Sequence, residues 1–343
     1  MSGVKEKRPI DLIEPRWRVM GSDYVTALAW SPDGSTLAAA SASGPILLLE
    51  EEAGRVVHEL PGHGMGTLAL DWSRDGRWLA SGGQDGKARV WDTSTGSEAQ
   101  VLEGGNGWVE HVTWSPRTNH LATAAGRFLK LWKDDGELIQ SHDDHASTVT
   151  GLAWLHDGRQ LTTACYGGVK LWRVGRRGAE QHFQRKGSFL SLSLSPSDKY
   201  LAAGCQDASL FVWNVKTAKN VGMSGYPGKI GLLDWNASSR YLATGSGKEA
   251  VLWDFSGAGP ANREPLVLGR HVDRIADLRF NPKQDVLATA GEDGMLILWN
   301  LPEGGMQDLC ILKNQLSRLA WSPRGAALAV GSADGEICQF AVD

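Results

Sequence analysis

Cysteine is scarce in this 343-residue sequence, and its four cysteines, Cys165, Cys205, Cys310 and Cys338, show no CxxC spacing. This pattern argues against a disulfide framework or a cysteine-based metal site, so we expect reduced thiols and a cytoplasmic setting. No stretch approaches the roughly 20 apolar residues of a membrane-spanning helix. The first residues carry charge but no apolar signal-peptide core. We therefore expect no membrane partner.

A large charge excess is also missing, because the formal net charge is only −4. Near balance predicts no specific nucleic-acid partner. The sequence contains no GxSxG motif, no P-loop and no dinucleotide-binding fingerprint. We accordingly expect no catalytic residue, no metal and no cofactor, and we predict that the protein is not an enzyme.

Glycine and tryptophan are abundant, with 42 and 15 residues, and they recur in a fixed pattern. In DWSRDGRWLASGGQDGKARVWD, residues 71–92, two Asp-Gly pairs separate short stretches of alternating apolar and polar residues. Asp-Gly is a strong signal for a tight hairpin turn. The stretch therefore predicts three antiparallel strands, whose apolar face must be covered by neighbouring units.

Eight copies of this unit follow one another at intervals of 40 to 45 residues. We call the bulky residue that ends the first strand of each copy its anchor. The anchors are Trp30, Trp72, Trp114, Trp154, Leu194, Trp235, Phe280 and Trp321. Every anchor is followed seven residues later by leucine and then by alanine, with Thr162 as the one exception. The small residue predicts a close approach between neighbouring sheets.

Apolar residues lie two residues before every anchor and, in most copies, also five residues before it. These two positions point to opposite faces of a regular strand. We therefore predict a β-bulge that turns side chains toward a rim or channel. Eight copies with this period predict an all-β fold, a closed eight-bladed β-propeller with four-stranded antiparallel blades. Seven blades with one displaced copy is the alternative.

The last copy reaches Phe340 and the sequence ends at Asp343, which leaves no residues for an outermost strand. The strand-like segment PRWRVM, residues 15–20, is therefore predicted to pair with the last copy and close the ring. We read residues 1–14 as a flexible N-terminal tail and residues 15–343 as a single domain.

The Gly62-His63 pair, the strand-turn pattern and the closing Trp91-Asp92 resemble the WD-repeat β-propeller family over about residues 15–343. The resemblance implies a hydrogen-bonded tetrad of His, Ser or Thr, Asp and Trp in each complete copy. Two copies have all four residues: His63, Ser81, Asp85 and Trp91 in the second, and His271, Thr289, Asp293 and Trp299 in the seventh. The supposed nucleophile would lie within a strand, so we interpret these sets as structural rather than as hydrolase triads.

The resemblance also implies a non-enzymatic scaffold that presents protein partners on the propeller rim, the ring itself being a monomer. The candidate rim residues come from the predicted bulges and from the turn after the second strand. They are Tyr24, Gln84, Trp108, Glu110, Tyr166, Gln206, Arg274 and Glu292, with Thr150, Leu190 and Ser317 as further bulge positions. Exposed Trp, Tyr and Arg are the residue types that anchor interfaces.

Three other constellations have a functional alternative. HDDH, residues 142–145, could offer ligands to a divalent metal, but His145 lies nine residues before its anchor and so has a structural role. The basic run at residues 173–186 could bind an acidic partner, although a solvated outer strand is the plainer interpretation. A small ligand or a reaction in the central channel remains the alternative function, and it would need His, Asp or Glu converging at one mouth.

Overall fold

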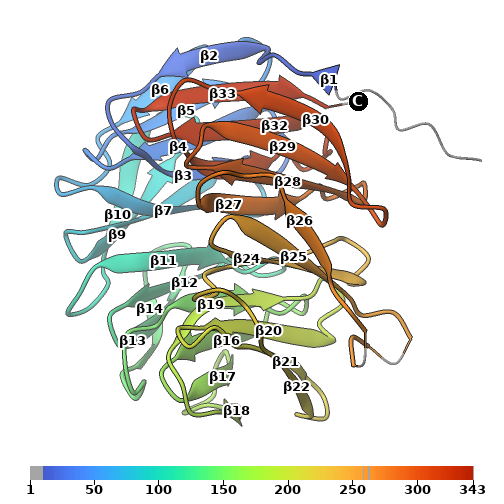
Figure 1. Ribbon diagram of the computed structural model, residues 1–343. Helices are drawn as coiled ribbons and strands as arrows, with labels where there is room; N and C mark the ends of the chain where they lie inside the picture. The colour runs from blue at the N-terminus through green and yellow to red at the C-terminus, as the bar shows by residue number, and fades with distance from the viewer. Residues whose placement is uncertain (1–10, 258, 262, 343) are drawn as a thin grey trace, which may run out of the picture.

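The computed structural model describes residues 11–342 apart from 258 and 262, and it forms a ring of eight sheets. Each sheet contains four antiparallel strands, and one carries an additional fifth strand. The strands of successive blades follow one another around the ring in Figure 1. The prediction of an eight-bladed propeller is therefore confirmed, and the seven-bladed alternative is wrong.

In each blade the chain passes from the innermost strand, at the channel, to the outermost strand. Blade 8 is the exception, because its outermost strand comes from the N-terminal segment. Blades 1 to 4 contain β3 (Val25–Trp30), β4 (Thr36–Ser41), β5 (Ile46–Glu50) and β6 (Val56–Leu60); β7 (Thr67–Trp72), β8 (Trp78–Gly83), β9 (Lys87–Asp92) and β10 (Ser97–Glu103); β11 (Val109–Trp114), β12 (His120–Ala125), β13 (Phe128–Lys133) and β14 (Leu138–His142); β15 (Gly151–Trp154), β16 (Gln160–Cys165), β17 (Gly168–Arg173) and β18 (Gln181–Gln184). Blades 5 to 8 contain β19 (Phe189–Leu194), β20 (Tyr200–Cys205), β21 (Leu210–Asn214) and β22 (Asn220–Met223); β23 (Leu232–Trp235), β24 (Tyr241–Ser246), β25 (Glu249–Asp254) and β26 (Leu266–Gly269); β27 (Ile275–Phe280), β28 (Val286–Gly291), β29 (Met295–Asn300) and β30 (Gly305–Ile311); β31 (Leu316–Trp321), β32 (Ala327–Ser332), β33 (Glu336–Ala341) and β2 (Trp17–Met20).

The N-terminal strand closes the ring, as predicted. Strand β2 pairs antiparallel with β33, and Trp17 lies opposite Gln339. Figure 1 shows blue β2 directly beside red β33. Trp17 also reaches blade 1, because its Nε1 donates to the Glu51 carbonyl at 2.8 Å and its ring lies against Gly54. One strand therefore completes blade 8 and fastens it to blade 1.

The preceding residues fasten blade 7 as well. Strand β1 (Asp11–Leu12) pairs parallel with β30 as a fifth strand of that blade. The Ile13 amide donates to the Leu309 carbonyl at 3.1 Å. The prediction of a flexible tail over residues 1–14 is thus wrong for residues 11–14, because the unpaired edge of β30 accepts backbone hydrogen bonds. Residues 1–10 lie outside the described part of the chain.

The repeated leucine and its small neighbour form the contacts between blades. All eight leucines seven residues after the anchors have no exposed surface, and neither do the seven alanines and Thr162 that follow them. Apolar clusters made by these positions extend from one blade to the next; one includes Trp30, Leu37 and Ala329 of blades 1 and 8. The sequence repeat therefore encodes inter-blade packing.

The anchor tryptophans add a repeated hydrogen bond between blades. Five anchor indoles donate Nε1–H to the carbonyl of the residue just before the anchor of the preceding blade, at 2.9 to 3.4 Å. The donors are Trp30, Trp72, Trp154, Trp235 and Trp321. The bond from Trp30 to Ala320 joins blade 1 to blade 8 across the closure. This bond fixes the tilt of each indole, buried in Trp30, Trp72 and Trp235 and half-buried in Trp154 and Trp321, while satisfying its only donor.

The predicted bulge occurs in six blades, where the register between the first and second strands shifts before the anchor. Blades 4 and 6 differ, because their first strands begin only at Gly151 and Leu232, beyond the bulge position. A universal bulge is therefore a wrong prediction for these two blades. A glycine, Gly151 or Gly231, lies at the start of each shortened strand and weakens regular pairing there.

The predicted tetrads hold the connections between blades. In blade 2, His63 Nδ1 lies 2.8 Å from Asp85 Oδ1, and its Nε2 lies 2.9 Å from Ser81 Oγ. Trp91 Nε1 donates to the same Ser81 hydroxyl. Blade 7 repeats this chain with His271, Asp293, Thr289 and Trp299. In both blades the histidine and the Ser or Thr are buried, so solvent and substrates cannot reach them.

Two partial tetrads use substitutes for the missing groups. In blade 4, His145 Nδ1 lies 3.0 Å from the Arg127 carbonyl in place of an aspartate, and its Nε2 lies 2.8 Å from Thr163 Oγ1. In blade 6, Tyr226 occupies the histidine position, and its hydroxyl joins Thr244 Oγ1 to Trp253 Nε1. Tyr226 lies nine residues before Trp235, the same spacing as the tetrad histidines, and that spacing could have revealed it.

Replacing Trp17 by alanine should lower the free energy of unfolding by about 3–5 kcal/mol, because it removes a buried indole at the ring closure. Thermal unfolding followed by circular dichroism measures this loss. Met20→Ala is the matched control, since Met20 lies on the same strand but is 63% exposed. Equal stability of the two variants would contradict the closing role of Trp17.

Gln339→Leu should stabilise the fold by about 1–3 kcal/mol, because a buried amide without partners carries a desolvation cost. Gln339 has no exposed surface and neither of its amide atoms has a hydrogen-bond partner. The equivalent residue of blade 7 is Leu298, as the strand register shows. Chemical denaturation should give a higher midpoint for Gln339→Leu and a lower one for the reciprocal Leu298→Gln. A destabilised Gln339→Leu protein would show that the amide has an essential partner.

His145→Gln should flatten the pH dependence of stability between pH 6.5 and 4. Burial lowers the pKa of His145 to about 4. The unfolded histidine, with a pKa of about 6.5, takes up a proton in this window while the folded one does not, so stability falls as the pH drops. Denaturation curves at several pH values measure the slope. The exposed His156, replaced by Gln, is the control, and its slope should match that of the unmodified protein.

Candidate interaction surface

The propeller has two faces that differ in their connections. The loop face carries the connections from the outer strand of one blade to the inner strand of the next, together with the turns between second and third strands. The hairpin face carries the turns between first and second strands and between third and fourth strands. This division follows from four antiparallel strands in each blade.

The candidate rim residues lie on the loop face except Glu110, which is the bulged residue of β11, at the position equivalent to Thr150 and Leu190. In several blades a backbone hydrogen bond ties the inter-blade connection to the turn after the second strand: Gln84 N to Gly66 O, Gln206 N to Ser188 O, and Glu292 N to Arg274 O. Tyr24 accepts the equivalent bond from Ala42 N. Tyr166 N instead donates to Ser147 Oγ at 2.9 Å. The face is therefore held by main-chain contacts, and most of its side chains remain available.

Aromatic side chains on this face are exposed. Trp108 is 52% exposed, Tyr166 is 46% exposed and Tyr24 is 36% exposed. Glu110, beside Trp108 in β11, is exposed, and partial desolvation raises the pKa of its carboxyl group. Exposed large aromatic residues of this kind are typical of interface anchors.

Sequence reasoning missed two apolar residues of the same face. Met65, in the connection between blades 1 and 2, is 66% exposed, and Val272, between blades 6 and 7, is 74% exposed. Both follow a tetrad histidine, at positions 63 and 271. The tetrad holds the loop down at the histidine and turns the next residues outward, so proximity to this histidine was the available signal.

Blade 7 contributes a charged pair. Arg274 Nε donates to Glu292 Oε1 at 2.9 Å, and this bond is the main cause that raises the pKa of Arg274. The Arg274 side chain is 59% exposed, so its other donors can reach a partner.

Three further bulge positions do not lie on the rim. Thr150 and Leu190 line the central channel, and Thr150 Oγ1 donates to the Phe189 carbonyl of the next blade. Ser317 has no exposed surface and donates to the Val25 carbonyl at 2.9 Å. Placing these residues on the rim was wrong, because their side chains face inward, toward the channel or the neighbouring blade.

The central channel is lined by residues from the first strands of all eight blades and has a volume of about 730 Å³. Its acidic residues bind backbone groups of the next blade: Asp71 accepts from Trp114 N, and Asp277 accepts from Leu319 N. Burial raises the pKa of Asp71 to about 6. These bonds give the channel carboxylates a structural role at the seams between blades.

The HDDH stretch and the basic run are engaged in local contacts. Asp144 pairs with Lys170 at 3.0 Å, and the His142 ring packs on Trp172. Arg173 and Arg176 both contact Glu180. Within residues 11–342, apart from 258 and 262, no cluster of three His, Cys, Asp or Glu side chains is placed to hold a metal ion.

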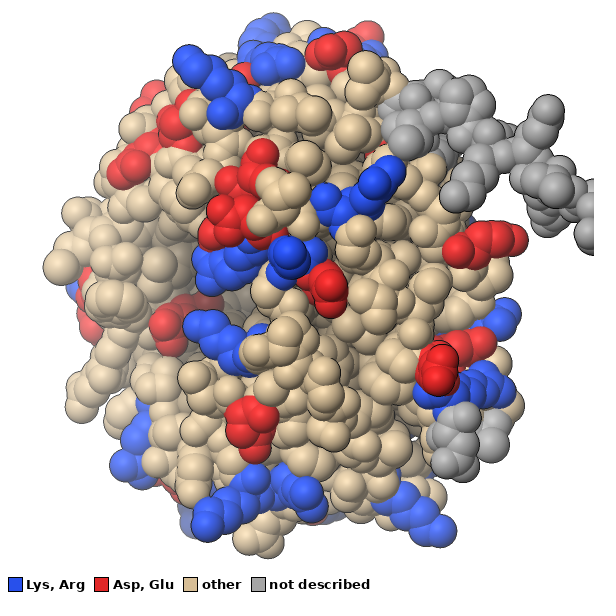
Figure 2. Space-filling model, in the orientation of Figure 1, with Lys and Arg blue, Asp and Glu red and all other residues tan. Residues whose placement is uncertain are grey.

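Charge is mixed over the face of the molecule drawn in Figure 2. Figure 2 shows acidic and basic side chains interspersed, with large neutral areas between them. The described part of the chain contains no helix long and apolar enough to cross a membrane.

Comparison with known proteins identifies relatives along most of the chain. Residues 24–259 match the family model of the IFT122 first beta-propeller, and residues 278–343 match that of the anaphase-promoting complex subunit 4 WD40 domain. Periodic tryptophan protein 2 of Arabidopsis thaliana is 29% identical over 63% of this chain and 24% of its own length. WD repeat-containing protein srw1 of Schizosaccharomyces pombe is 25% identical over 64% of this chain and 40% of its own length. The chain thus spans less than half the length of either relative.

Among solved structures, the computationally designed Ika8 protein superposes with a TM-score of 0.83. It covers 96% of this chain and all of its own, at 21% identity, which supports the fold alone. The family models, the repeated anchor pattern and the eight closed blades agree. The chain belongs to the WD-repeat β-propeller family.

Proposed function

We propose that this protein is a non-enzymatic scaffold that binds protein partners on its loop face. The observation that carries the proposal is the set of large apolar side chains exposed there, drawn from five different inter-blade connections and turns. They are Tyr24, Met65, Trp108, Tyr166 and Val272, with exposed fractions from 36% to 74%. Exposed Trp and Tyr side chains are among the residue types that most often anchor protein interfaces.

Rigidity supports the same proposal. The connections that carry these side chains are fastened by tetrads and by backbone hydrogen bonds, as at Glu292 and Arg274. A surface that is ordered before binding loses little conformational entropy on association. The pair Arg274 and Glu292 adds a polar element at the edge of the apolar set.

The relatives support a role in protein assemblies. Matched proteins of Arabidopsis thaliana include one named cell division cycle 20.6, cofactor of APC complex, and one named THO complex subunit 3. We extend from these names only the general role of binding proteins. We further propose a cytoplasmic monomer that needs no nucleic acid or membrane, in keeping with four buried free thiols.

A ligand-binding or catalytic channel is the second candidate function. It is supported by the channel volume of about 730 Å³ and by Arg279, whose side chain is 44% exposed. We favour the scaffold, because the channel carboxylates Asp71, Asp234 and Asp277 accept hydrogen bonds from backbone amides of the next blade.

The double variant Trp108→Ala/Tyr166→Ala should lose its partners at least about tenfold in affinity capture from the native cell, because both aromatic anchors are removed. The matched control is Val101→Ala/Leu138→Ala, whose side chains are 41% and 45% exposed on outer strands. Both variants should unfold at the same temperature as the unmodified protein. Unchanged partners in the loop-face variant would rule out this surface.

A further inference from the structure

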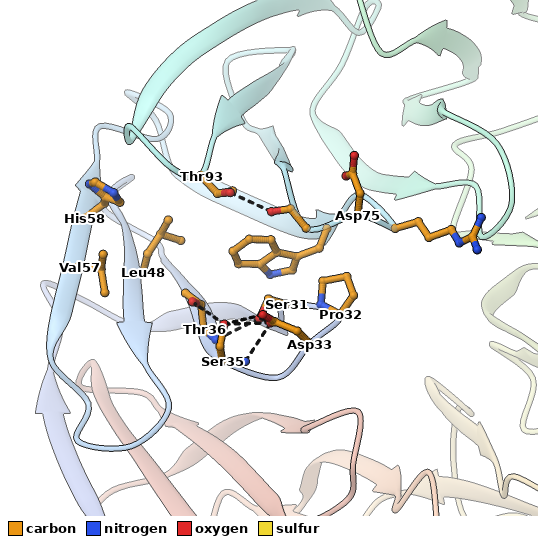
Figure 3. Close-up of a pocket in the computed structure, with 13 residues that line it drawn as sticks. Ser31, Pro32, Asp33, Ser35, Thr36, Leu48, Val57, His58, Asp75 and Thr93 are labelled. Atoms are coloured by element: carbon orange, nitrogen blue, oxygen red, sulfur yellow. Dashed lines mark hydrogen bonds between the residues drawn. The ribbon is translucent and has the colours of Figure 1, made fainter.

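The hairpin face contains a groove between blades 1 and 2 that the scaffold function does not use. It encloses a cavity of about 460 Å³, between the first-to-second turns of the two blades and the outer strand β6. Figure 3 shows Asp33 and Asp75 on opposing turns, with Val57 and His58 from β6 at the other end. Trp72 and Leu48 also line the cavity.

At this groove blade 1 carries a small residue where blade 2 carries a large one. Thr36 starts β4, and the equivalent start of β8 is Trp78. The matching groove between blades 2 and 3, lined by Trp78, retains only about 10 Å³. One side chain therefore accounts for much of the difference between an open groove and a filled one.

Among the described residues of the first three blades, the outer end of the groove lacks a side-chain hydrogen bond to the next blade only in blade 1. In blade 2, Gln100 Nε2 donates to the Asp134 carbonyl of the next blade, and in blade 3, Gln140 Nε2 donates to the Arg176 carbonyl. The strand register places His58 at the equivalent position of blade 1. His58 lies against Gly96 and lines the cavity. The groove therefore extends from the inner turns to the outer strand, which suits an extended segment.

The inner end of the groove carries negative charge. Asp33 Oδ1 accepts from Ser31 Oγ and from Ser35 N, and Asp75 Oδ1 accepts from Ser73 Oγ and from Arg77 N. These bonds hold the pKa of each carboxyl group below its usual value, with the serine hydroxyl as the largest cause in each. Both groups are therefore ionised near neutral pH. Arg74 is the one permanently cationic side chain in the lining, so the carboxylates outnumber it.

The indole ring of Trp72 lines the same cavity as the two carboxylates and forms an aromatic wall there. Trp72 is held in place because its Nε1 donates to the Ala29 carbonyl at 3.0 Å. A guanidinium group can stack on an indole and also form paired hydrogen bonds with a carboxylate, whereas an ammonium group can do only part of this. We propose that the groove between blades 1 and 2 binds an arginine side chain carried by an extended segment of a partner protein.

The probe is an acetylated and amidated peptide, Gly-Ala-Arg-Ala-Gly, compared with the same peptide containing citrulline, which keeps the shape of arginine and lacks its charge. NMR titration of the protein should shift the indole signal of Trp72, assigned with Trp72→Phe. The arginine peptide should bind at least about tenfold more tightly than the citrulline peptide, as expected for a charge-assisted contact. A lysine peptide should fall between them. Equal binding of the arginine and citrulline peptides, or binding of neither, would overturn the proposal.

Two variants test the groove itself. Thr36→Trp should abolish peptide binding, since it copies the residue that fills the groove between blades 2 and 3. Asp33→Asn/Asp75→Asn should weaken binding about tenfold or more while retaining oxygen acceptors for the turns. Undiminished binding by either folded variant would overturn the assignment. If Thr36→Trp does not fold, the aspartate variant and the citrulline peptide still decide the result.

The matched control is Asp157→Asn, because Asp157 caps the equivalent turn of blade 4 by accepting from Arg159 N and Gln160 N. This control should bind the arginine peptide as the unmodified protein does. The loop-face variant Trp108→Ala/Tyr166→Ala should also retain peptide binding, because its residues lie on the opposite face. The outcome in the groove is therefore separate from that of the proposed scaffold function.

Discussion

Closure of the ring is the constraint on which this structure depends. Each blade is a sheet with two apolar faces, and neither face can be covered by the blade itself. The buried leucine and alanine of every copy meet the next blade, so an open array would leave two such faces in water. The N-terminal segment meets this constraint by pairing β2 with β33, by placing Trp17 on blade 1 and by adding β1 to blade 7.

Because the periodic residues make the contacts between neighbouring blades, the residues on the two faces of the ring can differ from blade to blade. Anchor indoles and channel aspartates bind the neighbouring backbone, so their side chains are committed to assembly. The side chains of Trp108 and Tyr166, in contrast, are exposed to solvent and remain available to a partner. The same freedom on the hairpin face allows Thr36 in blade 1 where blade 2 has Trp78, and a groove results. A regular scaffold thereby carries irregular surfaces.

The periodic positions were predictable from the sequence because each of these residues packs against the same kind of neighbour in successive blades. Anchors such as Trp72 and the following Leu79 pack between neighbouring blades, so their spacing reveals them. The tetrad of His63, Ser81, Asp85 and Trp91 was placed by the family resemblance together with the spacing. The exposed loop-face residues could be chosen by type and position. Met65 and Val272 were missed, although each lies one or two residues after a tetrad histidine, and that proximity was the available signal.

The sequence by itself determined the repeat of eight units, the strand pattern and a closing strand at residues 15–20, since these follow from the periodic positions and from the strand-like segment ahead of the first copy. Only the tertiary structure decided which residues face the channel and that β1 adds a fifth strand beside β30. It also decided that a groove lies beside Thr36. The buried side-chain amide of Gln339, which has no hydrogen-bond partner, also emerged only in the tertiary structure, whereas the spacing of Tyr226 from Trp235 could have revealed its place in the histidine position. The physical reason is that a repeat specifies contacts common to all blades, whereas these features arise where particular side chains from two different blades meet.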